Sequence, residues 1–467
     1  MPTPTEDFLS RLCRHSFLSL WSHPHPHRNT TPVPHELCDV LVVFGNDVIL
    51  FSDKSTTFPL HDSVQVAWGR WYRAAVLDSA RQLFGAIRWV RDFPGRVFAD
   101  AACTEPLRVP LPDPASATYH LVAVAWGAGD ACQQFYGPGS SRSLMIKSDL
   151  VGDAHFQDPF CIGRVDPIRP FVHVFDEMSL QCVMREIDTT PDFIEYLKKR
   201  AALLATPNPL IIAPGEEELL ASYLTHLDEH GAHSFLQAGE GDGLDGVMFG
   251  EGGWNNYIGH QQRKAKIDAN RISYLWDHLL EHFIKELPER SSPQFEGDPA
   301  SINRERALRV MASETRLSRR MYGRHLAEVL EGTRTLAPRT PFVRVGFIAE
   351  KPDTSYVFLV LAPDPARPRE EYELARKNIL AAYCNVLSVE LPEARQIVGI
   401  AMVPAGVTPA SEALCFMRTD NITDEFRNEA RRIQAELNIL LNFRERVLVA
   451  HETEYPDSAP TRLQHVD

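Results

Sequence analysis

Several patterns that would point directly to a function are missing from this 467-residue sequence. Its eight cysteines are scattered and form no CxxC pair, which argues against a zinc ribbon or a disulfide framework and favours free thiols in a reducing compartment. There is no GxSxG motif and no GxxxxGK(S/T) motif, so serine catalysis and a P-loop find no support. No apolar run approaches the length of a membrane span. We therefore expect a soluble, cytoplasmic protein with no membrane partner.

The charge of the chain also limits its partners. The formal net charge is −14, which argues against avid binding to nucleic acid. Residues 1–150 are nearly neutral, however, with 13 Lys and Arg against 14 Asp and Glu. Phosphate binding depends on a local patch more than on the sum over the protein. With 44% hydrophobic residues, the chain can bury more than one core, and we expect more than one domain.

Two short apolar runs carry the most chemical information. Residues 40–44 and 48–51 are apolar and mostly β-branched or aromatic, and the Gly-Asn-Asp between them is a turn sequence, so they predict a β-hairpin. In an antiparallel pair, Asp39 at the start of the first strand lies near Asp53 and Lys54 at the end of the second. Carboxylates beside a lysine can hold a divalent metal while the lysine supports an attacking water or a developing anion.

This arrangement resembles the core of the PD-(D/E)XK nucleases, in which an Asp opens one strand and an acid, any residue and a Lys close the next. Asp39, Ser52 and Lys54 fall in that register. Ser52 stands where the family has its second acid, and Asp53 follows one residue later. Because strand side chains alternate between faces, Asp53 points away from Lys54 unless the strand bulges or ends there. The resemblance covers about the first 130 residues and implies a restriction-endonuclease-like mixed sheet flanked by helices.

The resemblance also implies roles for particular residues. Asp39 and Asp53 would hold Mg²⁺ or Mn²⁺, and Lys54 would stabilise the transition state. A further acid is expected from the preceding segment, for which Glu6 and Glu36 compete. We carry two hypotheses: a metal-dependent nuclease that hydrolyses phosphodiester bonds of DNA or RNA, in antiviral defence or repair, and a non-catalytic interaction or regulatory protein on a degenerate nuclease fold. Protein partners and the oligomeric state stay open.

The flanking segments predict helices and further strands. Residues 7–21 have helical periodicity with Thr5 as N-cap, and residues 64–91 read as one long amphipathic helix. Two later apolar runs, 96–98 and 120–126, are expected to complete the sheet. At 100° per residue, five arginines of the long helix fall within an arc of about 80°. This stripe either follows a phosphate backbone or is a solvated face; it consists of Arg70, Arg73, Arg81, Arg88 and Arg91.

The rest of the chain predicts three further regions after a nuclease-like domain over 1–150. We expect a mainly helical middle over 151–338, a compact α+β module over 339–450 and a polar tail over 451–467. A second group of arginines, on the helix expected over 301–330, is interpreted as facing acids of the same protein. Four histidines before the hairpin are expected in an extended loop, from which His27 or His35 would act as a general base if it lay over the hairpin end; the four are His23, His25, His27 and His35.

Overall fold

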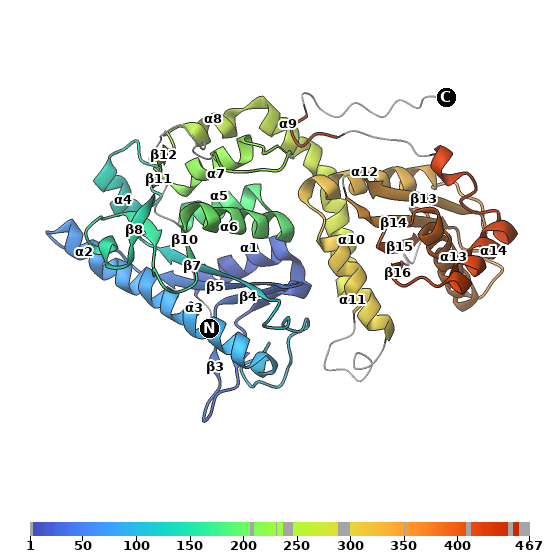
Figure 1. The fold of residues 1–467 in the computed structure, drawn as a ribbon, viewed down its shortest axis with the longest axis horizontal. Helices are drawn as coiled ribbons and strands as arrows, with labels where there is room; N and C mark the ends of the chain where they lie inside the picture. Colours follow the sequence, from blue (N-terminus) through green and yellow to red (C-terminus); the bar gives the residue numbers. More distant parts are fainter. Residues whose placement is uncertain are drawn as a thin grey trace. The chain divides into compact units, whose positions relative to one another are not determined.

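The chain forms two compact units, Met1–Lys264 and Ala265–Asp467, in a computed structural model. The structure describes residues 3–205, 210–229, 231–236, 246–287, 299–349, 351–407, 412–446 and 452–456. Both units are mixtures of helices and mixed sheets (Figure 1). Within these described ranges, no helix has the length and apolar character needed to cross a membrane.

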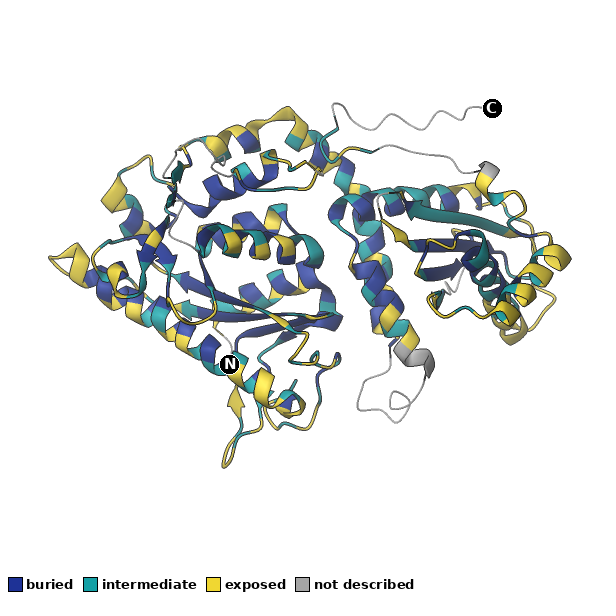
Figure 2. Ribbon diagram, viewed as in Figure 1, coloured by how far each residue is buried: buried dark blue, intermediate teal, exposed yellow. Residues whose placement is uncertain are grey.

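A five-stranded mixed sheet forms the centre of unit 1, in the order β1-β4-β5-β7-β10 (Figure 1). Its strands are β1 (Ser22–Pro24), β4 (Val40–Phe44), β5 (Asp47–Ser55), β7 (Thr118–Trp126) and β10 (Val172–Asp176). The first three are an antiparallel meander, whereas β5, β7 and β10 run parallel. The predicted hairpin is confirmed, with Val40 opposite Phe51. Helices cover both faces of the sheet, so β4 is buried along its whole length (Figure 2). This burial on both faces explains why the strand is apolar at every position.

Helices α1 (Pro4–Trp21) and α6 (Thr190–Leu204) cover one face of this sheet. The ring centroids of Phe17 on α1 and Phe193 on α6 lie 6.1 and 6.3 Å from that of Phe51. The opposite face carries the helix predicted over 64–91, which is α2 (Val64–Tyr72), a π-helical turn η1 (Arg73–Leu77) and α3 (Asp78–Asp92) in continuous succession.

The start of α1 differs from the prediction. Thr3, not Thr5, is the N-cap: its side chain accepts a hydrogen bond from Glu6 N, and the Glu6 carboxylate accepts one from Thr3 N at 2.7 Å. Pro4 then occupies the first helical position, where its missing N–H costs nothing. A Thr followed three residues later by Glu is a capping box, and this reciprocal pair outweighs the single cap that Thr5 would offer.

Two smaller sheets and several helices complete unit 1. One sheet has the order β3-β2-β6 and the other β12-β11-β8-β9. The strands are β2 (His27–Arg28), β3 (His35–Glu36), β6 (Val97–Phe98), β8 (Met145–Val151), β9 (Cys161–Arg164), β11 (Leu210–Ala213) and β12 (Gly246–Met248). The helices are η2 (Pro94–Arg96), α4 (Gly129–Tyr136), η3 (Gly152–Phe156), α5 (Glu177–Glu186), α7 (Glu216–Thr225), α8 (Gly253–Gly259) and α9 (Gln261–Asn270), which continues past Lys264.

Unit 1 therefore extends beyond the boundary expected near residue 150. The reason is β10, which pairs in parallel with β7 and completes the main sheet from within the region expected to be mainly helical. That region also contributes β9, β11 and β12. The expected strand over 96–98 exists as β6 but lies in the smaller sheet. The histidine segment, expected as an extended loop, forms β2 and β3 of that same sheet.

Unit 2 contains a four-stranded sheet in the order β13-β14-β15-β16. Its strands are β13 (Pro341–Ile348), β14 (Lys351–Leu361), β15 (Gln396–Met402) and β16 (Ala413–Arg418). Its helices are η4 (Arg271–Ser273), α10 (Tyr274–Lys285), α11 (Pro299–Ala312), α12 (Arg316–Gly332), α13 (Arg369–Glu390), α14 (Asp424–Leu437) and η5 (Phe443–Arg446). Leu387 of α13 packs with Leu359 and Ile397 in the core against this sheet.

Arginines of α12 pair with acids of their own unit, as the charge balance predicts. Arg316 and Arg319 bind the two carboxylate oxygens of Asp277 at 2.7 and 2.8 Å. Arg324 binds Glu452 at 2.6 Å. Glu452 belongs to the expected tail, so the start of that tail forms an ion pair with α12. Buried guanidinium groups require such partners, because an unpaired charge in the interior is costly.

Candidate functional site

The predicted acids gather at the open end of the β4–β5 hairpin. Asp39 directly precedes β4, and Asp53 and Lys54 lie near the end of β5. Asp39 and Asp53 are both buried, each with 4% of its surface exposed. The backbone N–H of Asp53 donates a hydrogen bond of 2.6 Å to Asp39 Oδ2. The antiparallel pairing thus brings the Asp39 carboxylate to the backbone of Asp53, fourteen residues later in the sequence.

Residues 52 and 53 point to opposite faces of the sheet. The pairing of β5 with β7 runs without a bulge from Asp47 to Ser55, so strict alternation holds. Ser52 is fully buried and donates a hydrogen bond to Gln82 Oε1 of α3 at 3.1 Å. Asp53 Oδ1 accepts one from Trp126 Nε1 at 2.5 Å. Asp53 therefore does not share the face of Lys54, as the alternation predicts.

One oxygen of this acid pair stays without a donor. Asp53 Oδ2 is buried and accepts no hydrogen bond from any residue within the described ranges. A buried carboxylate oxygen without a partner costs free energy that a bound cation would recover. The acid pair is therefore chemically suited to a hard divalent cation, which prefers oxygen ligands.

Glu6 and Glu36 lie close enough to act on this pair electrostatically, and both raise the pKa of Asp39. One oxygen of each is already engaged: Glu6 in the α1 capping box and Glu36 with His25 Nδ1 at 2.8 Å. Among the described residues, Glu6, Asp39 and Asp53 do not form a group whose ligand atoms all lie within 4.8 Å of one another. Whether they share one ion stays a prediction.

Burial dominates the electrostatics of the site. It raises the pKa of Asp39 to about 6, against the opposing effects of the Asp53 N–H and of Lys54. Burial also raises the pKa of Asp53, against its hydrogen bonds with Thr5 and Trp126. The hydrogen bond with Glu36 raises the pKa of His25. Lys54 lowers the pKa of both carboxyl groups, but burial outweighs this effect at each of them.

We expect the burial of Asp39 to make stability depend on pH. The folded-state pKa of Asp39, about 6, exceeds its ordinary 3.8, so between these values the folded protein binds more protons than the unfolded chain. The free energy of unfolding then falls as pH rises from about 4 to 6, and the loss is complete above that. Asp39→Asn should therefore stabilise metal-free unit 1 by about 3 kcal/mol at neutral pH and by nearly nothing below pH 4.

Urea unfolding at several pH values measures this effect. Tryptophan fluorescence reports mainly on unit 1, because Trp276 alone among the tryptophans lies in unit 2. Asp62→Asn, at an exposed loop position, is the matched control and should change stability little at any pH. A destabilising effect of Asp39→Asn at neutral pH would contradict the cost inferred for burying the charged Asp39 carboxylate.

The predicted arginine stripe is exposed at all five positions. Arg70 and Arg88 form no ion pair with any residue that the structure describes, whereas Arg81 binds Asp78 at 2.5 Å and Arg73 lies over the ring of Phe156. The stripe is not continuous, however. The π turn η1 holds more residues per turn than an α-helix, so an arc computed at 100° per residue does not extend across it.

Three residues of the site were not found from the sequence. His25, rather than His27 or His35, reaches the acids, and it does so with a left-handed backbone (φ 49°). Trp126 ends β7, and Gln82 lies in α3. A signal existed only for Trp126: it follows an apolar run, and side chains at the carboxyl ends of neighbouring parallel strands meet at one edge of a sheet.

No family model matches the chain, and no curated protein and no solved structure matches it either.

Proposed function

We propose that this protein is a metal-dependent nuclease whose site lies at the open end of the β4–β5 hairpin. The observation that carries the proposal is the buried pair of Asp39 and Asp53, with Asp53 Oδ2 lacking a donor among the described residues and Lys54 next along the strand. A buried carboxylate oxygen without a hydrogen-bond donor is suited to a hard divalent cation, which prefers oxygen ligands.

The order of elements supports a restriction-endonuclease-like core. A helix, α1, precedes the antiparallel meander β1-β4-β5; the long helix α2–α3 follows, and β7 returns parallel to β5. This is the succession of helix, hairpin, helix and strand that the resemblance to PD-(D/E)XK nucleases implies. Asp39, directly before β4, and Lys54, in β5, are the residues that the resemblance assigns to the family motif.

Each side chain has a role in the proposed reaction. Asp39 and Asp53 would hold Mg²⁺ or Mn²⁺, with the free oxygen of Glu6 or Glu36 completing the ligands. A bound cation of this kind would polarise a phosphodiester and lower the pKa of a water. Lys54 would stabilise negative charge that develops on the phosphate. Glu36 holds His25 through Nδ1 and so places an imidazole beside the acids.

One set of contacts favours the second hypothesis, a non-catalytic interaction or regulatory protein. Ser52 replaces the expected acid and is hydrogen-bonded to Gln82, and Trp126 occupies one oxygen of Asp53. These contacts give Ser52 and one oxygen of Asp53 hydrogen-bond partners within the protein, so neither group needs a metal ion. A degenerate site would keep the fold and the exposed arginines but would not hydrolyse nucleic acid.

A nuclease assay of the purified full-length protein separates the two hypotheses. Supercoiled plasmid, single-stranded DNA and RNA are each incubated with Mg²⁺, with Mn²⁺ and with EDTA. The nuclease hypothesis expects cleavage of at least one substrate with Mg²⁺ or Mn²⁺ and none with EDTA. Cleavage that survives EDTA contradicts the metal-dependent mechanism, and intact substrates under all conditions favour the interaction protein.

A further inference from the structure

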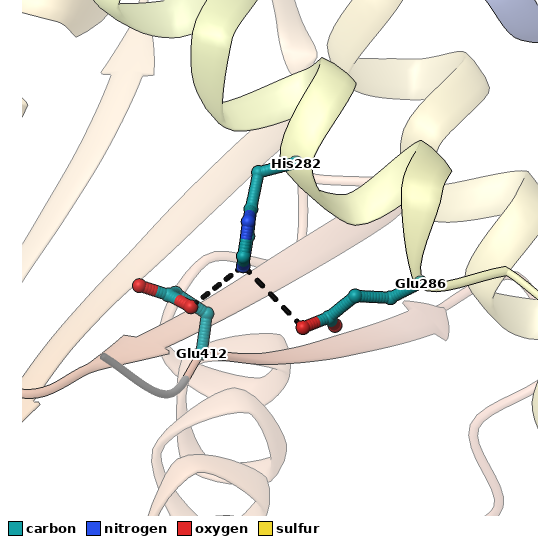
Figure 3. A group of neighbouring side chains, drawn as sticks. All are labelled: His282, Glu286 and Glu412. Carbon is teal, nitrogen blue, oxygen red and sulfur yellow. Dashed lines mark ion pairs between the residues drawn. The ribbon is translucent and has the colours of Figure 1, made fainter. Parts of the chain in front are cut away.

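Unit 2 contains a second group of metal-ligating side chains, far in the sequence from the hairpin. His282 Nε2 lies 2.7 Å from Glu412 Oε2 and 3.4 Å from Glu286 Oε1 (Figure 3). Among the residues that the structure describes, this is the group of three His, Cys, Asp or Glu residues whose ligand atoms all lie within 4.8 Å of one another. Figure 3 shows the imidazole edge directed between the two carboxylates.

Local structure explains why these three side chains meet. His282 lies in the last turn of α10, and Glu286 caps that helix four residues later, so the two share one helix face. Glu412 comes from the residue directly before β16. Its Oε2 is buried and accepts no hydrogen bond from the described residues, although it lies so close to His282.

A neighbouring arginine orients one of the carboxylates. Arg304 of α11 donates a hydrogen bond of 2.5 Å to Glu286 Oε2. This leaves Glu286 Oε1 directed at His282, because the other oxygen is held. Groups behind a ligand fix its orientation in this way in established metal sites. Two carboxylates against one guanidinium also leave an excess negative charge at the group.

We propose that His282, Glu286 and Glu412 form a site for a divalent transition-metal ion, best suited to Zn²⁺. One imidazole nitrogen and two carboxylate oxygens are ligands that Zn²⁺ accepts, and the imidazole disfavours Mg²⁺ and Ca²⁺, which take oxygen ligands. Three protein ligands leave a fourth position of a tetrahedral ion for water. The site lies in the unit that does not contain the hairpin acids, and it does not depend on the proposed nuclease activity.

The spacing of the ligand atoms fits such an ion after a small adjustment. Tetrahedral Zn²⁺ with bonds near 2.0–2.1 Å places its ligands about 3.3 Å apart. The separation of 3.4 Å between His282 and Glu286 already matches this value, and that of 2.7 Å between His282 and Glu412 must widen by about half an ångström. Glu412 and Glu286 then bind the ion instead of crowding the imidazole.

Bound metal would join the end of α10 to the start of β16. These segments lie more than a hundred residues apart in the sequence. The ion would bind His282 and Glu286 at the end of α10 and Glu412 before β16. Ligands that are assembled only in the folded state couple metal binding to folding. Zn²⁺ should therefore raise the melting temperature of unit 2 in the full-length protein.

Metal titration of the full-length protein tests the site. Protein freed of metal with a chelator is titrated with Zn²⁺ by calorimetry and with Co²⁺ by visible absorption. The variants are Glu412→Gln, Glu286→Gln and His282→Ala. His278→Ala is the matched control, since His278 is exposed and lies one turn earlier on α10. Any Zn²⁺ that binds to the cysteines or to the histidines near the hairpin binds equally in all variants. The difference in stoichiometry between variants therefore reports on the group in unit 2.

We expect the wild type and His278→Ala to bind one more equivalent of Zn²⁺ than the three site variants, and to show a Co²⁺ absorption band that those variants lack. Zn²⁺ should raise the melting temperature of the wild type and of the control alone. The two glutamine variants keep the size of the side chain, so circular dichroism should show them folded. Equal Zn²⁺ stoichiometry in the wild type and in folded Glu412→Gln would overturn the proposal and leave the group a surface ion pair.

Discussion

Asp39→Asn should reduce Mg²⁺- or Mn²⁺-dependent cleavage at least about 100-fold, because it removes one of the two buried carboxylates proposed to hold the ion. The loss should not come from unfolding. The asparagine side-chain oxygen can still accept the hydrogen bond from the Asp53 N–H, and the substitution removes a charge whose pKa burial raises to about 6. Melting temperature should stay the same or rise while activity falls.

Two further variants sharpen this experiment. Lys54→Ala should lower the cleavage rate but leave metal affinity largely intact, because an ammonium is no metal ligand. Asp62→Asn changes an exposed acid of the same unit and should leave cleavage unchanged. Full activity in both Asp39→Asn and Lys54→Ala would place the chemistry elsewhere. Metal affinity at the hairpin is measured by titrating Mn²⁺, which separates loss of the ion from loss of the chemical step.

Reversing Arg70, Arg81 and Arg88 together to Glu should weaken binding to nucleic acid by at least about tenfold near 0.15 M salt. Each lost phosphate contact removes about 0.9 from the slope of log affinity against log salt, so the slope should fall by about two to three. All three side chains are exposed, and Arg81 alone loses an ion pair, with Asp78. The melting temperature should therefore change little.

The matched control reverses three exposed arginines of unit 2, Arg334, Arg395 and Arg431, and so changes the net charge by the same amount. Binding is measured by fluorescence anisotropy with labelled single-stranded and duplex DNA over a range of salt concentrations. Equal losses in the two triple variants would show that only the overall charge matters. In that case the exposed helix face would be a solvated surface and not a nucleic-acid interface.

The amino-acid sequence alone determined the helices and hairpins whose contacts are made between residues close together in the chain. The hairpin over 40–51 follows from two β-branched runs around a Gly-Asn-Asp turn, and all its hydrogen bonds close within about fifteen residues. The helix over 64–92 follows from its apolar periodicity in the same way. The contact between the Asp39 carboxylate and the Asp53 N–H also belongs here, since antiparallel pairing alone brings these groups together.

The tertiary structure alone decided which distant groups complete the site and where unit 1 ends. Trp126 reaches Asp53 because β7 pairs with β5, and β10 joins the sheet because it pairs with β7. Gln82 meets Ser52 because α3 packs on one face of β5, and the π turn that interrupts the arginine arc is invisible to a fixed period of 100°. His25 reaches Glu36 through a left-handed backbone in a proline-rich segment. Such contacts depend on packing between segments far apart in the chain, whereas composition and periodicity record only the preferences of neighbouring residues.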